Sequence, residues 1–134
     1  MYEDGYINIV GIDISETVIE YMISKSNELG YKIKHLVMDA RDMEFKDNSF
    51  EAIIDKGTID AILCGNDSIS NVDMVLSEVY RCLSRSGVFL LISFGKPENR
   101  MEFLQEYKWQ ITCTSVRDTT QQCTEHFIYS MVKQ

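Results

Sequence analysis

Apolar residues in this chain gather in short blocks, and the spacing within each block predicts a strand or a helix. Apolar runs, mostly rich in β-branched residues, predict four buried strands, at 7–14, 33–38, 50–54 and 88–94. Apolar residues three or four positions apart predict helices between them. This alternation predicts an α/β fold with a parallel sheet, made by a single domain that spans residues 1–134.

The ends of the first predicted helix carry capping residues. Ser15 follows the strand at 7–14 and is expected to be the N-cap, with Ile14 and Ile19 spaced as a hydrophobic staple. Gly30 is placed to end the helix in a left-handed conformation. The residues that share the apolar face of this helix are Val18, Met22 and Leu29.

Two further helices and a long apolar strand are expected in the middle of the chain. Residues 59–63 predict a short helix after a turn at Gly57. A longer amphipathic helix is expected to end near Gly87, and its apolar positions are Val72, Leu76, Val79 and Leu83. The run at 88–94 is the most continuously apolar one and predicts a central parallel strand that is covered on both faces.

The C-terminal part of the chain has a different pattern. Residues 99–107 predict a helix, and two β-rich runs follow at 109–116 and 126–132. A polar segment joins these two runs, which predicts an antiparallel β-hairpin.

Charge and hydropathy narrow the choice of partners. The chain has 134 residues, a net charge of −8 and a pI near 4.7. Such a surface repels phosphate backbones, so we expect no direct binding to nucleic acid. It suits a basic protein partner, although solubility alone also explains it. No apolar run approaches the ~20 residues of a membrane helix, and "MYEDGYINIV" lacks the basic segment of a secretory signal, so we expect no membrane association and a cytoplasmic location.

The cysteines do not form a recognisable metal motif. None of the four stands in a CxxC pair, and only two histidines accompany them, so no metal site is expected. We interpret Cys64 and Cys82 as small core residues with free thiols. Cys113 and Cys123 are spaced to face each other across the predicted hairpin, but a disulfide between them is not expected.

Three of the predicted parallel strands end in an aspartate: Asp13, Asp39 and Asp55. In an open α/β sheet the ligand crevice lies outside the carboxyl ends of the strands, so these side chains are expected to line one rim. The alternative is a structural role, because aspartate at a strand end bonds nearby backbone N–H groups.

Each of these aspartates has a chemical role available in binding a nucleoside. The carboxylate of Asp13 can accept two hydrogen bonds from a ribose diol. Asp39 can accept from the exocyclic amine of adenine while the N–H of Ala40 donates to the ring, and Asp55 can reach the reactive end of a cofactor or an incoming substrate.

Three segments of the chain resemble a known family. These segments read "IVGIDIS", "MDARDMEFKDNSFEAIIDKGTIDAIL" and "VLSEVYRCLSRSGVFLLISFG". They resemble the class I S-adenosylmethionine-dependent methyltransferases, whose fold is a Rossmann-like seven-stranded sheet, from about Gly5 to the C-terminus. "DKGTID" is the most specific piece and is similar to the branch that includes elongation factor 1-alpha lysine methyltransferases and the methyltransferase domain linked to endothelin-converting enzyme 2.

The resemblance implies S-adenosyl-L-methionine as the cofactor and assigns residues to it. Asp13 with Ile14 would hold the ribose, and Asp39 with Ala40 would hold the adenine. Asp55 and Gly57 would lie beside the methionine end of the cofactor.

The same resemblance makes Asp55 and Lys56 the candidate catalytic residues beside the methyl acceptor. Lys56 has an equally weighted alternative as a solvated side chain or a carboxylate partner. Thr58 is interpreted as a helix cap or a site residue, and Asp60 as a surface acid or a site residue.

The chain departs from the family pattern at its start. The family has a first strand and a D-x-G-x-G turn before the stretch that matches "GYINIVGIDIS", and no such glycine cluster occurs here. We therefore expect a partial domain, shortened at the N-terminus. In the family strand order 3-2-1-4-5-7-6 this leaves two unpaired edges. Either the two edge strands pair directly, or self-association or a partner chain fills the place, or the domain is unstable alone.

Two functions follow. The first is methyl transfer, most simply to a lysine of a protein such as a basic translation factor, with alkylammonium contacts from Phe94, Tyr107 or Trp109 set against the alternative of core packing. The second is a non-catalytic binding or regulatory module that pairs through its sheet edge. A nicotinamide-dependent oxidoreductase is disfavoured because the chain has no G-x-G-x-x-G.

Overall fold

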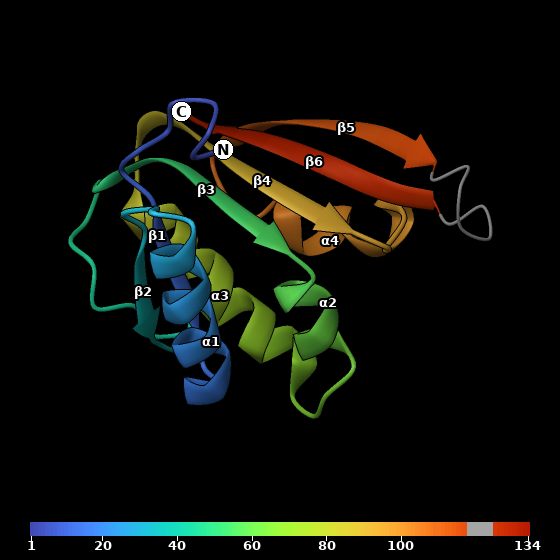
Figure 1. Ribbon diagram of the computed structural model, residues 1–134. Helices are drawn as coiled ribbons and strands as arrows, with labels where there is room; N and C mark the ends of the chain where they lie inside the picture. The colour runs from blue at the N-terminus through green and yellow to red at the C-terminus, as the bar shows by residue number, and fades with distance from the viewer. Residues whose placement is uncertain (118–124) are drawn as a thin grey trace. The chain divides into compact units, whose positions relative to one another are not determined.

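The computed structural model describes residues 1–117 and 125–134 of the chain (Figure 1). The chain divides into two compact units, Met1–Glu44 and Phe45–Gln134, and each contains its own sheet. Parallel strands, antiparallel strands and helices occur together, so the predicted α/β class is confirmed. The assignment of residues 1–134 to a single domain stays a prediction.

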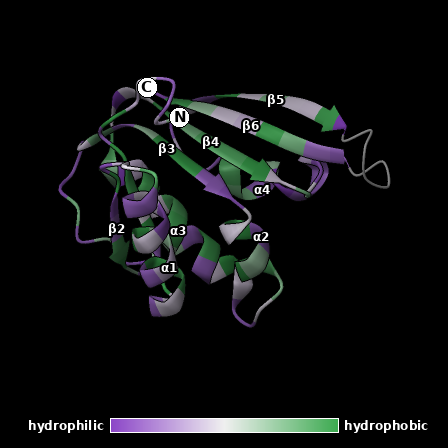
Figure 2. Ribbon diagram, in the orientation of Figure 1, coloured by the Kyte–Doolittle hydropathy of each residue, from purple (hydrophilic) through white to green (hydrophobic). Residues whose placement is uncertain are grey.

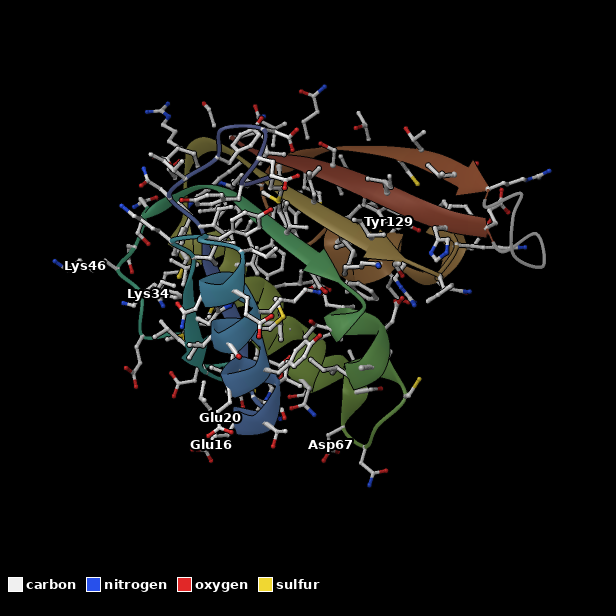
Figure 3. All side chains as sticks on the ribbon, viewed as in Figure 1. Glu16, Glu20, Lys34, Lys46, Asp67 and Tyr129 are labelled. Carbon is white, nitrogen blue, oxygen red and sulfur yellow. The ribbon has the colours of Figure 1, made fainter. Side chains whose placement is uncertain are left out.

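The N-terminal unit is a strand–helix–strand element. Strands β1 (Val10–Asp13) and β2 (Lys34–Val37) pair in parallel, and helix α1 (Glu16–Glu28) connects and contacts them. Exposed charged side chains project from α1 and β2, and Figure 3 labels Glu16, Glu20 and Lys34 among them.

Both ends of α1 are capped as the sequence predicts. The hydroxyl of Ser15 accepts a hydrogen bond from the N–H of Val18 at 3.4 Å. At the other end Gly30 adopts a left-handed φ of 71°. Its N–H donates to the carbonyl of Asn27 at 3.1 Å, and the following N–H of Tyr31 donates to that of Ser26 at 2.8 Å. This is a Schellman motif, so the predicted N-cap and C′ residues are confirmed.

The burial expected for this unit is partly wrong. Ile7 and Ile14 lie outside β1 and are more than half exposed, so the buried strand is shorter than 7–14. The buried positions of α1 are Ile19 and Ser26, while Val18 and Leu29 are exposed. Residues seven apart share one helix face, so only that narrow stripe is covered by a sheet of two strands.

The C-terminal unit contains a four-stranded mixed sheet. Its strands are β3 (Phe50–Lys56), β4 (Leu83–Ser93), β5 (Trp109–Arg117) and β6 (Glu125–Lys133), in the order β3-β4-β6-β5. Its helical segments are α2 (Thr58–Leu63), α3 (Ser68–Cys82), η1 (Pro97–Asn99) and α4 (Met101–Leu104). β3 and β4 are parallel, and β6 runs antiparallel to both β4 and β5, which confirms the C-terminal hairpin.

The strand orders agree with the family resemblance. The pair β2-β1 corresponds to the 3-2 part of the expected order, and β3-β4-β6-β5 corresponds to 4-5-7-6. Among the described residues β1 pairs only with β2, and β3 pairs only with β4. The expectation that self-association or a partner chain covers these edges stays a prediction.

The core of the C-terminal unit lies between α3 and the sheet strands. The buried positions of α3 recur every three or four residues, and Figure 2 shows the apolar character of β4 and β6. The fully buried side chains of this core include Val72, Leu76, Cys82, Leu83, Phe89, Leu91, Leu104, Tyr129 and Met131. Burial of this apolar area is the main source of the unit's stability.

Several sequence expectations for this unit need correction. The long helix ends at Cys82 rather than near Gly87, because β4 already begins at Leu83. Gly87 itself lies within β4, in the stretch between Leu83 and Val88 where the register against β3 is irregular. Burial alternates along β4, with Phe89 and Leu91 buried and their neighbours half-buried, so the strand is not fully covered on both faces. In place of the continuous helix expected at 99–107, two short helical segments, η1 and α4, lie between Pro97 and Leu104.

The cysteines follow the prediction only in part. Cys82 is a fully buried free thiol as expected, but Cys64 is exposed, so its interpretation as a core residue is wrong. Cys113 is free and exposed on β5, and Cys123 lies outside the described residues. In the described parts of the chain, no helix has both the length and the apolar character needed to cross a membrane.

Candidate functional site

Two of the three strand-end aspartates lie at one edge of the N-terminal unit. Asp13 ends β1 and is the register partner of Val37, the last residue of β2. Asp39 follows two residues later, and the N–H of Met38 donates to the carbonyl of Asp13 at 2.9 Å. The parallel pairing therefore brings both carboxylates to the carboxyl edge of the same sheet, as predicted. Asp55 belongs to the C-terminal unit, and the convergence of all three on one rim stays a prediction.

The Asp13 carboxylate is partly occupied by the start of α1. Its Oδ1 accepts a hydrogen bond from the N–H of Ser15 at 2.8 Å. Its Oδ2 has no hydrogen-bond partner among the described residues and remains able to accept from a ligand. Ile14, the next residue in the chain, is 68% exposed, so its side chain offers apolar surface.

The Asp39 carboxylate is bound by Arg41. The guanidinium Nε and Nη2 lie 2.7–3.1 Å from the two carboxylate oxygens, and the N–H of Arg41 donates to Oδ1 at 2.9 Å. The Arg41 hydrogen bonds outweigh partial burial and lower the pKa of Asp39. The carboxylate is therefore ionised at neutral pH and retains lone-pair capacity for one more donor.

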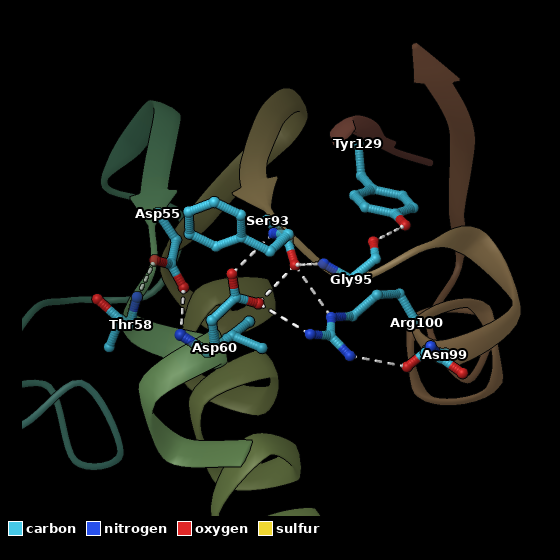
Figure 4. Close-up of polar contacts among 10 residues, drawn as sticks. Asp55, Thr58, Asp60, Ser93, Gly95, Asn99, Arg100 and Tyr129 are labelled. Carbon is cyan, nitrogen blue, oxygen red and sulfur yellow. Dashed lines mark hydrogen bonds and ion pairs between the residues drawn. The ribbon is translucent and has the colours of Figure 1, made fainter. Parts of the chain in front are cut away.

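Asp55 lies within β3 and caps the helix that follows. Its Oδ1 accepts from the N–H of Thr58 at 2.8 Å, and its Oδ2 accepts from the N–H of Ile59 at 3.0 Å (Figure 4). Asp55 is only 8% exposed. This burial raises the pKa of Asp55, and the effect outweighs that of the two backbone hydrogen bonds, which act to lower it. All three strand-end aspartates thus have the backbone-bonding role that the sequence left open as the alternative.

The residues after Asp55 form the turn into α2. Lys56 is exposed and makes no ion pair with another described residue. Gly57 has a φ of 87°, a left-handed conformation that favours glycine, and is the N-cap of α2. The cap interpretation of Thr58 is therefore wrong, because Thr58 is the first helical residue and Asp55 satisfies its N–H.

A second polar network links α2 to the loop after β4, and the sequence did not predict it. Oδ1 of Asp60 accepts from the hydroxyl of Ser93 and from Nη2 of Arg100, the latter at 2.9 Å. Oδ2 accepts from the N–H of Phe94 at 2.9 Å. Burial acts to raise the pKa of Asp60, but these hydrogen bonds outweigh it and lower that pKa. Asp60 is therefore a network residue rather than a surface acid.

Gly95 and Tyr129 complete this network. The Ser93 hydroxyl oxygen accepts from the N–H of Gly95 at 2.9 Å and from Nε of Arg100 at 3.0 Å. A Cβ at Gly95 would lie 2.1–2.3 Å from atoms of the Arg100 guanidinium, so only glycine leaves room for it. On the other side Tyr129 donates to the carbonyl of Gly95 at 2.6 Å (Figure 4). The arrangement fixes the loop to α2 and to β6 at once.

The three aromatic residues considered for cation binding differ in their surroundings. Trp109 is buried and donates to the carbonyl of Leu104 at 2.6 Å, so core packing is confirmed for it. Tyr107 is half-buried and bonds to Asp73. Phe94 is 60% exposed, with its ring centroid 4.4 Å from that of His126, so core packing is wrong for Phe94.

One local signal for Asp60 was present in the sequence. An acid in the first turn of a helix is stabilised by the helix dipole, and Asp60 is the third residue of α2. Its partners Ser93 and Arg100 lie 33 and 40 positions away, so local spacing does not reveal them.

The comparison with known families decides the classification. A family described as "Methyltransferase domain" matches residues 1–133. The chain belongs to this methyltransferase domain family. Its mixed sheet and the order of its strands are therefore those of a Rossmann-like methyltransferase.

Relatives of this methyltransferase domain are known in animals. A Bos taurus protein named eEF1A lysine and N-terminal methyltransferase is 41% identical over 98 residues, which are 72% of this chain and 14% of that protein. EEF1A lysine methyltransferase 4 of Mus musculus is 29% identical over 137 residues, which cover 95% of this chain and 51% of that protein. The chain thus spans about half or less of the length of these curated relatives.

Solved structures show the same fold at low sequence identity. A Pyrococcus horikoshii protein superposes with a TM-score of 0.77 and 18% identity, over 98% of this chain and 74% of its own. A SAM-dependent methyltransferase from Methanosarcina mazei has a TM-score of 0.73 and 15% identity, over 94% and 82% of the two chains.

Proposed function

We propose that this methyltransferase domain uses S-adenosyl-L-methionine to methylate a lysine of a protein, with eEF1A as the partner. The family match over residues 1–133 carries the proposal. The names of the relatives, which include eEF1A lysine methyltransferases, support the acceptor. These names disfavour a non-catalytic module. A cytoplasmic location and a basic protein partner belong to the same proposal, and the net charge of −8 suits such a partner.

The carboxyl edge of the N-terminal unit fits the adenosyl part of the cofactor. Asp13 has an unoccupied Oδ2 for the ribose diol, and the exposed Ile14 adds apolar surface. Asp39 is held ionised by Arg41 and is proposed to accept from the adenine amine, with the N–H of Ala40 donating to the ring.

The turn at the end of β3, which contains Lys56 and Gly57, is proposed to lie beside the methyl acceptor. The cofactor supplies an electrophilic methyl group, so alignment of the acceptor contributes most of the rate. Asp55 already accepts two amide N–H groups, and its proposed role is to fix the turn that carries Lys56 and Gly57. The exposed Lys56 ammonium is proposed to contact a carboxylate of the bound cofactor.

Calorimetric titration with S-adenosyl-L-methionine, together with transfer of a radiolabelled methyl group to purified mammalian eEF1A, tests this proposal. Asp13→Asn keeps one oxygen for Ser15 and replaces the other with a donor, so it should raise the cofactor Kd about tenfold to a hundredfold. Asp42→Asn, an exposed acid close in sequence, is the matched control and should leave Kd unchanged.

The outcome that contradicts the proposal is equally clear. No heat at millimolar cofactor, and no label on eEF1A, would exclude the methyltransferase activity for this chain. Mass spectrometry of the labelled eEF1A should place the methyl group on a lysine side chain, and a label on another residue type would overturn the proposed acceptor.

A further inference from the structure

Phe94 is a large apolar side chain that the fold leaves exposed at the carboxyl end of β4. It follows Ser93, the last residue of β4, and lies two positions after Ile92, the register partner of Lys56. Its ring therefore stands at the same sheet edge as the turn after β3. Ligands of parallel α/β sheets bind at this edge.

The backbone of Phe94 is held by Asp60. The N–H of Phe94 donates to Oδ2 of Asp60, whose other oxygen binds Arg100. The side chains of Asp60 and Arg100 are only 16% and 12% exposed, so solvent weakens this ion pair little. The backbone of Phe94 is thus fixed by hydrogen bonds, although the residue lies in the loop after β4.

The loop is also fixed from the opposite side. Tyr129 of β6 is fully buried and donates to the carbonyl of Gly95, and His126 of the same strand lies against the Phe94 ring. Burial raises the pKa of the Tyr129 hydroxyl, which stays protonated as a donor. Two elements therefore determine where the ring lies.

We propose that the Asp60–Ser93–Arg100 network is a positioning device that presents the exposed Phe94 ring to the cationic side chain of the methyl acceptor. The face of an aromatic ring attracts an alkylammonium group, and its edge does not. Orientation of the ring therefore matters as much as its presence. This inference rests on the proposed function and names the part of the site that recognises the acceptor.

Steady-state kinetics with purified eEF1A as acceptor tests the ring. Phe94→Leu keeps apolar bulk and removes the π face, so KM for eEF1A should rise about threefold to tenfold while the cofactor Kd stays unchanged. Phe94→Trp keeps an aromatic face and should therefore have the wild-type KM. An unchanged KM in Phe94→Leu, or a change in cofactor Kd instead, would overturn the inference.

Two further variants test the network without touching the ring. Arg100→Gln removes the charge that Asp60 binds, and Gly95→Ala expels the guanidinium sterically. Both should reproduce the KM rise of Phe94→Leu with kcat within about twofold of the wild type. The matched control is Arg85→Gln, an exposed arginine near the other end of β4, which should change nothing. Thermal unfolding identifies a variant that fails to fold.

A binding experiment without cofactor separates this inference from the proposed function. The chain with ¹³C-labelled phenylalanine is titrated with tetramethylammonium chloride against sodium chloride of equal ionic strength. The Phe94 ring resonance, assigned with Phe94→Leu, should shift in the wild type and not in Arg100→Gln or Gly95→Ala. A shift without methyl transfer would contradict only the proposed function. Transfer without a shift, or equal shifts in all variants, would contradict only this inference.

Discussion

Two carboxylates at the start of α2 respond to their surroundings in opposite ways. Asp55 is buried, and this burial raises its pKa above the ordinary value of 3.8. Asp60 is also desolvated, but hydrogen bonds that include the Arg100 ion pair lower its pKa below the same value. The free energy of unfolding depends on pH through the difference between folded and unfolded pKa values.

The two single variants Asp55→Asn and Asp60→Asn should therefore show pH effects of opposite sign. Asp60 stabilises the fold above its unfolded pKa, and this contribution is lost as pH falls through the folded value. Asp55 contributes stability below its unfolded pKa, and that is lost as pH rises through its raised folded value. From about pH 3 to pH 6, the stability gap between wild type and Asp60→Asn should grow and that for Asp55→Asn should shrink.

Urea unfolding at several pH values measures these gaps, with Asp42→Asn as the control variant. If the stability difference between wild type and variant changed with pH in the same direction for both variants, burial would dominate the pKa at both positions. Such a result would contradict the described Asp60 network, because its hydrogen bonds would then be too weak to hold the carboxylate ionised.

At the residue scale, the sequence predicts the acids but not their partners. Asp13, Asp39 and Asp55 are predictable because strand ends carry a local signature, and each lies at or near the end of its strand. The partner of Asp60 is Arg100, 40 positions away, and no local spacing encodes such a pair. Long-range side-chain contacts depend on the packing of whole elements, so they become visible only in the folded chain.

At the scale of elements, the C-terminal end of α3 is held by residues distant in sequence. The ammonium of Lys133 on β6 donates to the carbonyls of Tyr80 at 2.6 Å and Leu83 at 2.7 Å. The N–H groups of Asn48 and Ser49 donate to the two carbonyls in between, those of Arg81 and Cys82. These contacts satisfy the carbonyls that a helix end leaves without intrahelical partners.

Lys133→Met should therefore destabilise the chain more than a surface lysine substitution does. It removes a cation from a helix C-terminus together with several charge-assisted hydrogen bonds, and we expect a loss of about 1–3 kcal/mol in the free energy of unfolding. Urea denaturation measures this loss against that of Lys96→Met, an exposed lysine whose ammonium has no hydrogen-bond partner among the described residues. Equal losses of unfolding free energy in both variants would show that the hydrogen bonds of Lys133 to the end of α3 do not stabilise the fold.

The same contacts explain which helix ends were predictable. Ser15 and Gly30 cap α1 through their own side-chain and backbone chemistry, and both were predicted correctly. The end of α3 was wrongly expected near Gly87, because glycine is a common local stop signal. In the folded chain Lys133, Asn48 and Ser49 end the helix earlier, and none of them is near it in sequence.

At the scale of the whole molecule, buried apolar residues are unevenly divided. Of the hydrophobic residues that are buried in the described parts of the chain, only Ile19 and Met43 belong to Met1–Glu44. A segment of this size holds little core by itself, since units of about 40 residues usually need additional stabilisation. Local opening is therefore expected to be easier in the N-terminal unit than in the C-terminal one.

Native-state hydrogen exchange should show this difference. Amide protection in α1 should be at least about tenfold lower than in β4 and β6. On the proposed function, S-adenosyl-L-methionine at about one hundred times its Kd should raise protection in α1 by up to about a hundredfold, because Asp13 adjoins the start of that helix. Equal protection in α1 and β4 without cofactor would contradict the expectation.

The strand order of the C-terminal sheet has a consequence for synthesis on the ribosome. β6 follows β5 in the chain but lies between β4 and β5, and β5 has no other strand partner among the described residues. A nascent chain that has emerged only as far as β5 presents the β4 edge unpaired, and β5 has nothing to join. Slow emergence of Glu125–Lys133 would prolong this interval, during which chaperones or neighbouring nascent chains have access to that edge.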